Sequence, residues 1–379
     1  MEFEFTEEQL MIRQAARDFA QTELKPGVIE RDEQQKFPTE QIKMLGELGF
    51  MGMMVSPQYG GSGMDAIAYV LAMEELSKID ASASVVVSVN NSLVCYGLEK
   101  YGNEDQKQKY LVPLAKGEVI GAFCLSEPEA GSDATAQSTT AIDMGDHYLL
   151  NGTKNWITNG NTASTLIVIA QTDAAQQHHG INALIVEKGM AGVTVGAKEN
   201  KMGVRGSDTH SLHFNDVKVP KANRVGDDGF GFTFAMNALA GGRIGIAAQA
   251  LGIASGAYEL ALQYSKERKT FGHPIADHQA IQFKLADMAT EIEAARLLVL
   301  KAAWLKDNDQ PYSHASAMAK VFASETAMRT TTEAVQIHGG YGYVKEYHVE
   351  RLMRDAKITQ IYEGTSEIQR IVISRDILK

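Results

Sequence analysis

The sequence predicts a multidomain α+β protein in which two helical regions flank a β region. Helical periodicity and capping signals run over about 6–116, short β-rich stretches broken by Gly and Asn follow over about 119–219, and a helical pattern returns from about Gly226. A chain of 379 residues is too long for one ordinary core and is expected to divide. The expected parts are an N-terminal α-helical domain (1–118), a central β-barrel or sandwich domain (119–225) and a C-terminal four-helix-bundle domain (226–379).

The first region carries the start signals of several helices. Thr6, with Gln9 three residues later, predicts a capping box, and Leu10, Ala15 and Phe19 continue an apolar face. Further helices are expected over about 37–49, 65–77, 83–99 and 104–114, with a glycine-rich turn at 57–63.

The two later regions differ in the spacing of their apolar residues. Strands are expected around 147–150, 165–170, 183–186 and 211–214. In the last region, spacings of four, three, four, three and four predict the core face of a bundle helix; the stripe is Ile281, Leu285, Met288, Ile292, Ala295 and Val299. We expect the two helical regions to pack together, with the β domain on one side.

Composition limits the classes of partner. The formal net charge of −11 argues against nucleic acid and anionic membrane surfaces, and the apolar run at 85–89 is too short to span a bilayer. The two cysteines, Cys95 and Cys124, exclude a disulfide framework, and ten histidines without a Cys or carboxylate cluster predict no metal site. The N-terminus lacks the pattern of a secretion signal, so we expect a cytoplasmic protein.

One segment near the C-terminus suits proton abstraction. Tyr362-Glu363-Gly364 places a carboxylate between an aromatic ring and a glycine. Apolar neighbours would raise the pKa of that carboxyl toward the working pH, and glycine lets backbone approach a ligand. Taken alone, the segment is more typical of an exposed Glu in a helix-capping turn. Its meaning therefore depends on the motifs that precede it.

Six short motifs follow one another along the chain. They are Ser126-Glu127-Pro128, Gly131-Ser132-Asp133, Trp156-Ile157-Thr158-Asn159-Gly160, Glu267-Arg268-Lys269-Thr270-Phe271-Gly272, Gln336-Ile337-His338-Gly339-Gly340 and the segment 361–367. Together they resemble the acyl-CoA dehydrogenase family of flavoenzymes. The resemblance covers essentially the whole chain and implies the same three-part α, β, α arrangement.

The resemblance implies FAD as the cofactor. No Gly-x-Gly-x-x-Gly opens a βαβ unit, so a Rossmann fold is not expected; in the family the isoalloxazine ring lies between the β domain and the C-terminal helices. Trp156 offers a flat face for stacking and Thr158 a hydroxyl. Arg268 and Gln279 match contacts that reach a neighbouring subunit's cofactor. The positions that match FAD contacts are Phe123, Leu125, Ser126, Gly131, Ser132, Trp156, Ile157, Thr158, Arg268, Phe271, Gln279, Gln336, Ile337, His338, Gly339, Gly340, Thr365, Ser366 and Glu367.

The implied chemistry removes a proton from the carbon next to a thioester while hydride leaves the following carbon for the flavin. Glu363 matches the family's base, and its backbone N–H and a flavin ribityl hydroxyl match the donors to the thioester oxygen. Some members carry the base on a C-terminal helix beside an Arg; the stretch 239–243 has no carboxylate, which favours Glu363. The positions that match substrate contacts are Ser132, Ala240, Arg243 and Gly364.

We therefore expect an FAD-dependent acyl-CoA dehydrogenase that converts a short straight or short branched acyl-CoA to a trans-2-enoyl-CoA. The resemblance also implies electron-transferring flavoprotein as the electron acceptor and a homotetramer. Glu129, where the family usually has Gly, and Ala240-Gly241-Gly242 before Arg243 depart from the common pattern, which leaves the acyl chain open. Two alternatives remain, a flavin oxidase of the same fold (acyl-CoA or nitroalkane oxidase) and a non-catalytic flavin or acyl-CoA binding protein. The pathway, fatty-acid oxidation or branched-chain amino-acid degradation, also stays open.

Overall fold

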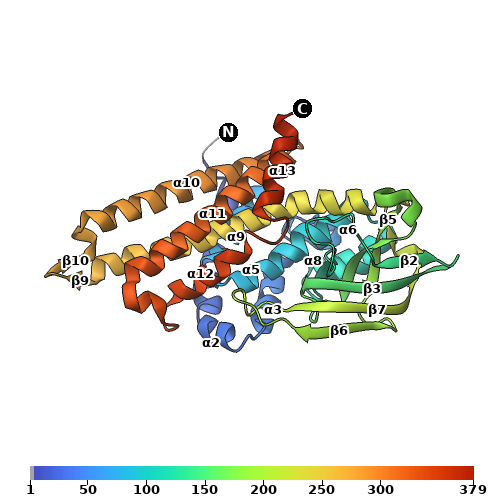
Figure 1. Cartoon of the computed structure of the whole chain (residues 1–379), viewed down its shortest axis with the longest axis horizontal. Helices are drawn as coiled ribbons and strands as arrows, with labels where there is room; N and C mark the ends of the chain where they lie inside the picture. Colours follow the sequence, from blue (N-terminus) through green and yellow to red (C-terminus); the bar gives the residue numbers. More distant parts are fainter. Residues whose placement is uncertain (1–3) are drawn as a thin grey trace.

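The computed structural model describes residues 4–379 and confirms the expected α, β, α order. Figure 1 shows an elongated molecule: the β domain forms one end, on the right, and the long C-terminal helices extend to the other. The N-terminal helices lie against both, and the two termini emerge on the same side.

The N-terminal region is helical from its first described turn. Thr6 caps the first helix through the expected box: its N–H donates to Gln9 Oε1 at 3.0 Å, and the Gln9 N–H donates to Thr6 Oγ1 at 3.2 Å. The elements of this region are α1 Glu7–Phe19, η1 Ala20–Leu24, α2 Val28–Glu33, α3 Thr39–Glu47, η2 Phe50–Gly52, η3 Pro57–Tyr59, α4 Ala66–Ser77, α5 Ala81–Ser88, η4 Val89–Cys95, α6 Tyr96–Tyr101, α7 Glu104–Gln106, η5 Lys107–Leu111 and α8 Val112–Ala115.

The apolar face expected for α1 was partly wrong. Leu10 and Ala15 are exposed, whereas Ala16 and Phe19 are buried. The two arginines of α1 form ion pairs with the buried carboxylate of Glu75 on α4, and these pairs help to set which side of α1 faces the core.

A continuous helical stretch, α5–η4–α6, forms the centre of the N-terminal region. This stretch and α9 (Gly231–Glu267) are long and apolar enough to cross a membrane by length and composition, but 94% and 83% of their most apolar windows are buried inside the protein. The expectation that the apolar run stops at 89 was wrong. Asn90 and Asn91 continue the buried surface because their side-chain amides donate to the Met51 and Phe50 carbonyls, both at 2.8 Å.

The β domain is one sheet with its own core. The order of hydrogen-bonded strands is β6-β7-β3-β2-β4-β5-β8, with β1 pairing to β4, and within residues 4–379 no pairing joins β6 to β8. The strands are β1 Gly121–Cys124, β2 Thr140–Asp143, β3 His147–Thr158, β4 Thr165–Gln171, β5 Ile181–Glu187, β6 Val193–Lys198, β7 Thr209–Pro220 and β8 Arg224–Val225, with short helical turns η6 Ala174–Gly180 and η7 Lys221–Asn223.

Strand β4 joins the β domain to the helices. Leu166 and Val168 point into the core of the sheet, while Ile167 and Ile169 between them belong to the helical core. Because side chains alternate along a strand, a strand buried on both faces must be apolar throughout. The continuous apolar run of β4 thus fixes the sheet against the helices.

The C-terminal region is a helical bundle around α9, α10 and α11. After α9 come β9 Lys269–Thr270, β10 His273–Pro274, η8 Ile275–Asp277, α10 Gln279–Asp307, α11 Ser313–His338, η9 Gly339–Tyr343, α12 His348–Ile358 and α13 Ser366–Ile377. The stripe predicted on α10 is confirmed as core, with five members buried and Ile281 partly buried against them. One apolar core includes residues of both helical regions, so these regions pack together as expected.

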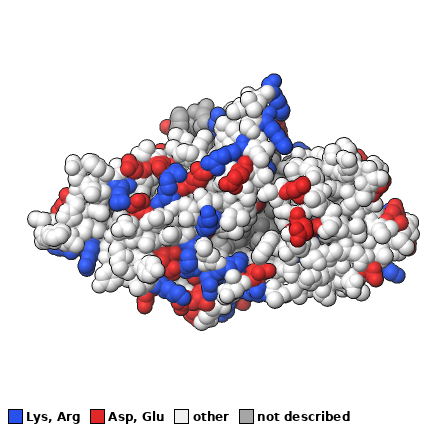
Figure 2. Space-filling model, viewed as in Figure 1, with Lys and Arg blue, Asp and Glu red and all other residues white. Residues whose placement is uncertain are grey.

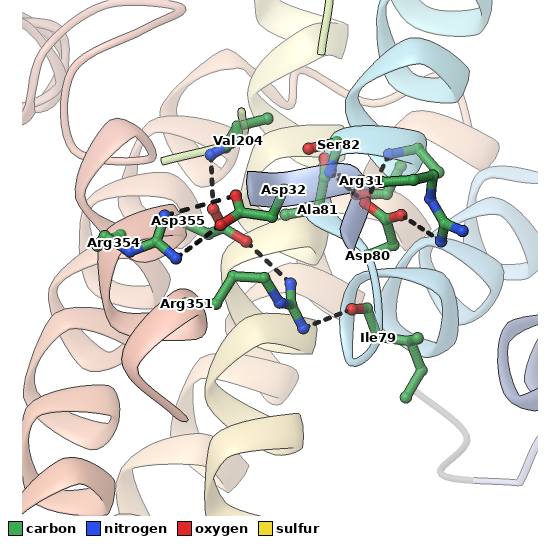
Figure 3. A network of polar contacts seen from close by, with 12 residues as sticks. Arg31, Asp32, Ile79, Asp80, Ala81, Ser82, Val204, Arg351, Arg354 and Asp355 are labelled. Atoms are coloured by element: carbon green, nitrogen blue, oxygen red, sulfur yellow. Dashed lines mark hydrogen bonds and ion pairs between the residues drawn. The ribbon is translucent and has the colours of Figure 1, made fainter. Parts of the chain in front are cut away.

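A network of buried charges ties α12 to the N-terminal region and to the loop before β7 (Figure 3). Asp355 on α12 accepts from the Val204 N–H at 2.5 Å and from Arg351 at 3.0 Å, and Arg351 also donates to the Ile79 carbonyl at 2.8 Å. Nearby, Arg354 pairs with Asp32 of α2 at 2.7 Å. These bonds join segments that lie far apart in the sequence.

Candidate active site

Glu363 lies in the turn between α12 and α13. Its backbone has φ 52°, and Gly364 follows with φ 90°, so two consecutive residues are in the left-handed region. Thr365 is the N-cap of α13, which means that the turn does cap a helix. The Glu363 side chain nevertheless turns inward, because its Oε2 is buried.

The carboxylate of Glu363 lies over α9 at Gly242. A Cβ built on Gly242 would be 2.2 Å from Glu363 Oε2 and 2.8 Å from Leu93 Cδ2, so only glycine leaves room for the carboxylate. In the described part of the chain, Oε2 has no hydrogen-bond partner. Within residues 4–379, the Glu363 N–H also donates to no protein acceptor. An unpaired carboxylate oxygen and a free N–H on one residue are groups left available for a ligand.

Burial dominates the acidity of this carboxyl. Desolvation raises the pKa of Glu363 to about 7, against the positive charges of Lys320 and Arg243, which lower it. Arg243 is 6% exposed, its Nε has no partner, and burial lowers its pKa. Glu363 as a residue is only partly buried, so the turn borders open space while Oε2 faces the bundle. A pKa near neutrality is what a general base requires.

Two side chains hold the carbonyls of the Glu363 turn. Lys320 on α11 donates from Nζ to the Gly364 carbonyl at 2.8 Å. Gln369 on α13 donates to the same carbonyl at 2.8 Å and to the Glu363 carbonyl at 3.2 Å. Both side chains are fully buried.

The β-domain residues predicted to contact flavin approach α9 from the other side. Phe123 at β1 stacks on Phe234 of α9, with ring centroids 6.5 Å apart and planes 19° apart. Trp156 has φ 61° at an irregularity of β3 between Lys154 and Ile157, and it is 62% exposed. The irregularity turns the Trp156 ring out of the sheet. Figure 2 shows a recess between the helical part and the β domain on the face that it presents.

The other residues of this group are placed less uniformly. Leu125 is buried and Ser126 half-buried, whereas Gly131 and Ser132 are exposed, with open space at Gly131. Ile157 is 2% exposed inside the sheet's own core, and Thr158 is half-buried.

A buried ion pair supports the loop that follows β1. Lys154 Nζ donates to Glu127 Oε1 at 2.7 Å and to the Leu125 carbonyl at 3.0 Å, and neither charged side chain has any exposed surface. Glu127 also accepts from the Ser138 N–H at 2.6 Å. Burial alone would raise the pKa of Glu127, but Lys154 and these hydrogen bonds hold it at about 2.

A second group of predicted FAD residues forms a groove of about 480 Å³ at the far end of α9. Its lining includes Arg268, Ile337, His338, Gly339 and Gly340. Atoms added at either glycine would meet nothing within 4 Å. Phe271 is 93% exposed beside it, and Gln279 and Gln336 are exposed. The Arg268 guanidinium lies over the Tyr341 ring, 5.5 Å from its centroid, and forms no ion pair within residues 4–379. Open glycine backbone next to such a guanidinium suits a phosphate group.

The two groups do not meet in one chain. Arg268, the C-cap of α9, lies 26 positions after Gly242, which corresponds to about 39 Å at 1.5 Å per residue. Figure 1 shows β9 and β10 at the end of the molecule opposite the β domain. Thr365, the buried Ser366 and the exposed Glu367 lie beside Glu363 rather than in the groove. The exposed Trp156 ring suits a flavin and the groove suits a pyrophosphate, so the residues present fit the two halves of FAD separately.

Three family models match the chain in order. They are the acyl-CoA dehydrogenase N-terminal domain over residues 6–118, the middle domain over 122–217 and the C-terminal domain over 229–378. This chain belongs to the acyl-CoA dehydrogenase family. It is an FAD-dependent enzyme of that family, and this assignment fits better than the oxidase and the non-catalytic alternatives.

Close relatives of this acyl-CoA dehydrogenase are known. The short-chain specific acyl-CoA dehydrogenase of Clostridium acetobutylicum is 51% identical over 379 residues, which is all of both chains. The structure of butyryl-CoA dehydrogenase from Megasphaera elsdenii matches with a TM-score of 0.99 and 50% identity over all of both chains. A chain solved in a structure of the electron transferring flavoprotein of Acidaminococcus fermentans matches with a TM-score of 0.99 and 54% identity, again over all of both chains.

Sequence reasoning missed two residues that shape the site of this dehydrogenase, Lys320 and Gln369. It singled out the stretch 240–243 but did not foresee that Gly242 makes room for the Glu363 carboxylate. A signal for Lys320 was present in the spacing of Ser316, Lys320, Ala323 and Ala327, which are four, three and four residues apart and all buried. A lysine inside such a stripe is a buried charge that needs a partner. The signal for Gly242 and Gln369 is absent from the sequence, because their contacts come from other elements.

Proposed function

We propose that this enzyme dehydrogenates short acyl-CoA thioesters, with Glu363 as the base that removes the α-proton. The observation that carries the proposal is the Glu363 carboxylate, whose buried Oε2 has no hydrogen-bond partner among residues 4–379 and whose pKa burial raises to about 7. Near neutral pH such a carboxyl is ionised in about half of the molecules. Burial favours its neutral form, so the carboxylate readily accepts a proton from a substrate.

The residues of this chain would divide the work as follows. The Glu363 carboxylate takes the α-proton. The Glu363 N–H, which has no acceptor among the described residues, donates to the thioester oxygen as it becomes negative. Trp156 and Phe123 border the place of the isoalloxazine ring, while Arg268 and the Gly339–Gly340 backbone hold phosphate. When bound, FAD accepts the hydride that leaves the β-carbon. Arg243, unpaired beside Glu363, adds positive charge for the thioester end rather than for a distant phosphate.

The packing of α9 supports a short acyl chain. One turn beyond Gly242, a Cβ on Gly245 would lie 2.5 Å from both Ser88 Oγ and Tyr69 Oη, so α9 touches α5 and α4 directly. One further turn along, Gln249 donates to the Ala81 carbonyl at 2.9 Å and accepts from the Tyr362 hydroxyl. The space behind Glu363 is therefore filled. Forcing extra methylenes into such a core costs on the order of 1–3 kcal/mol.

We also propose a homo-oligomer, in the form of a homotetramer. The two FAD groups lie at opposite ends of α9 in one chain, so a complete site requires the groove of a neighbouring subunit beside the flavin site. Light scattering with FAD bound would test the assembly, and a monomer that retains FAD tightly would contradict it.

Two further proposals concern the surroundings of the enzyme. We propose that electron-transferring flavoprotein receives the electrons, supported by the 54% identical chain solved in a structure of such a flavoprotein. We propose a cytoplasmic location, supported by two buried free cysteines and by the burial of both apolar helices. Reduction of a purified electron-transferring flavoprotein, and cell fractionation, would test these two points.

Anaerobic bleaching of the flavin tests the reaction and the chain length together. Butyryl-CoA should bleach the enzyme, and the rate should fall along a series that extends to palmitoyl-CoA. Glu363→Gln should keep its yellow colour and lose bleaching by about 10²–10⁴-fold. Glu40→Gln, an exposed carboxylate on α3, is the matched control and should bleach normally. Bleaching of Glu363→Gln at a rate close to that of the wild type would refute the assignment of the base.

A further inference from the structure

Lys320 is a buried lysine that forms no ion pair within 4 Å in the described part of the chain, residues 4–379, and points at the Glu363 turn. It is fully buried on α11, and the polar contact of its Nζ is the Gly364 carbonyl at 2.8 Å. A buried charge without a close carboxylate is costly and needs a reason. Its position beside the base supplies one.

We propose that Lys320 and Gln369 act together as positioning residues that fix the backbone of the turn at Glu363 and Gly364, so that the carboxylate and the N–H of Glu363 serve one thioester. The proposal rests on Glu363 being the base. The two residues divide the work, since Lys320 supplies a hydrogen bond and a positive charge, whereas Gln369 supplies hydrogen bonds alone.

The geometry of the turn requires such support. Both Glu363 and Gly364 have positive φ, which is a sparsely populated backbone conformation for Glu363. The Gly364 carbonyl receives two donors, one from α11 and one from α13, and the Glu363 carbonyl receives a third from Gln369. Three hydrogen bonds from buried side chains to two successive carbonyls fix the 363–364 and 364–365 peptides. With the backbone on the C-terminal side of Glu363 held in this way, the Glu363 side chain and its free N–H, which belongs to the preceding peptide, have less freedom to change direction.

The charges around Glu363 come from several elements. Lys320 on α11 and Arg243 on α9 both favour the ionised carboxylate. From α4, the buried phenol of Tyr69 faces the same space, and Glu363 adds to the effect of burial in raising the pKa of Tyr69. Tyr362, next in the chain, has its pKa raised by burial and by Glu363. Glu367 faces Lys320 from α13. Among these, Lys320 is the one that both bonds the turn and carries charge.

Three variants separate the hydrogen bonds from the charge. Lys320→Gln keeps an N–H donor and removes the charge, Gln369→Met removes the donors and changes no charge, and Lys320→Met removes both. Lys306→Met is the matched control, because Lys306 on α10 is another lysine whose pKa burial lowers to about 8, as it does for Lys320, and its amine contacts Met54 rather than the turn. FAD absorbance and cooperative thermal unfolding show that each variant is folded and loaded.

The measurement is the rate of flavin bleaching by saturating butyryl-CoA across pH 5.5–9. Removing the positive charge should raise the pKa of Glu363. In Lys320→Gln the acid limb, the part of the profile where the bleaching rate rises with pH, should therefore move upward by about one pH unit, which lowers the rate at pH 6 roughly tenfold. Gln369→Met should lower the alkaline plateau on the order of tenfold and leave the limb in place. Lys320→Met should show both changes, and Lys306→Met neither.

Two results would overturn the proposal. One is a wild-type limb and plateau in both Lys320→Gln and Gln369→Met; the other is an equal change in Lys306→Met, which would show a general effect of losing a buried lysine. A failure of the base assignment looks different, since Glu363→Gln would then continue to bleach.

Discussion

Two buried carboxylates, Asp355 and Glu363, lie a few residues apart and are treated in opposite ways by the structure. Asp355 accepts from the Val204 N–H at 2.5 Å and from Arg351 at 3.0 Å (Figure 3). Glu363 has Lys320 and Arg243 near enough to alter its pKa, but its buried Oε2 accepts nothing. Burial raises the pKa of both, to about 6 for Asp355 and about 7 for Glu363. A shifted pKa therefore does not distinguish a carboxylate that is fully used in the structure from one that is left available to a ligand; the hydrogen bonds of the carboxylate do.

Removal of the paired carboxylate gives the largest expected effect on stability. Asp355→Ala removes the acceptor of the buried Val204 N–H and leaves the Arg351 guanidinium without its carboxylate partner, and should lower the free energy of unfolding by about 3–5 kcal/mol. Urea unfolding followed by far-UV circular dichroism measures it. Glu346→Ala, an exposed carboxylate ahead of the same helix, should change stability by less than about 0.5 kcal/mol. A mild effect at Asp355 would mean that the network is dispensable.

Removal of the unpaired carboxylate should stabilise the protein. Between pH 4.5 and about 7 the folded chain keeps a proton on Glu363 that the unfolded chain has released, so stability falls as pH rises through this window. Glu363→Gln cannot ionise and should be more stable than the wild type by up to about 3 kcal/mol at pH 8, with the gain vanishing below pH 4.5. Thermal unfolding at a series of pH values checks this. Destabilisation at pH 8 would mean that the carboxylate is paired after all.

The space reserved for Glu363 can be filled directly. Gly242→Ala places a methyl group 2.2 Å from the present position of Oε2 and should displace the carboxylate. A displacement of about 1 Å should slow flavin bleaching on the order of 100-fold. Gly241→Ala is the neighbouring control, since its added Cβ meets nothing closer than 3.8 Å, and it should slow bleaching far less. Equal losses in the two variants would point to helix α9 rather than to the carboxylate.

The smallest expected effect concerns the exposed ring on the β side. Trp156→Leu should weaken FAD retention by about 1–2 kcal/mol, roughly tenfold in dissociation constant, because a stacking face is lost. Trp304→Leu, at the protein's other tryptophan, is the control and should leave FAD binding unchanged. Fluorescence of released FAD on dilution measures both. If Trp304→Leu releases FAD as readily, Trp156 does not stack on the flavin.

Local patterns in the sequence predicted much of the fold. The Thr6–Gln9 capping box, the alternation between helical and β regions and the apolar stripe of α10 each depend on neighbours within a few positions, and each is confirmed. The prediction of which residues of α1 face the core was partly wrong, because ion pairs to α4 help to set the rotation of this helix. Motif reasoning also selected the residues of both FAD groups and Glu363, although their roles remain proposals.

The sequence by itself determined the family and the order of the helical and β regions. It also pointed to Glu363 as the carboxylate suited to proton abstraction. The tertiary structure decided that this carboxylate turns inward over Gly242, that Lys320 and Gln369 bond the carbonyls of its turn, and that the two groups of predicted FAD residues lie about 39 Å apart along α9. The reason is physical: motifs and periodicities are set by neighbours in the chain, whereas burial, charge and available space at Glu363 come from α9, α11 and α13, which only folding brings together.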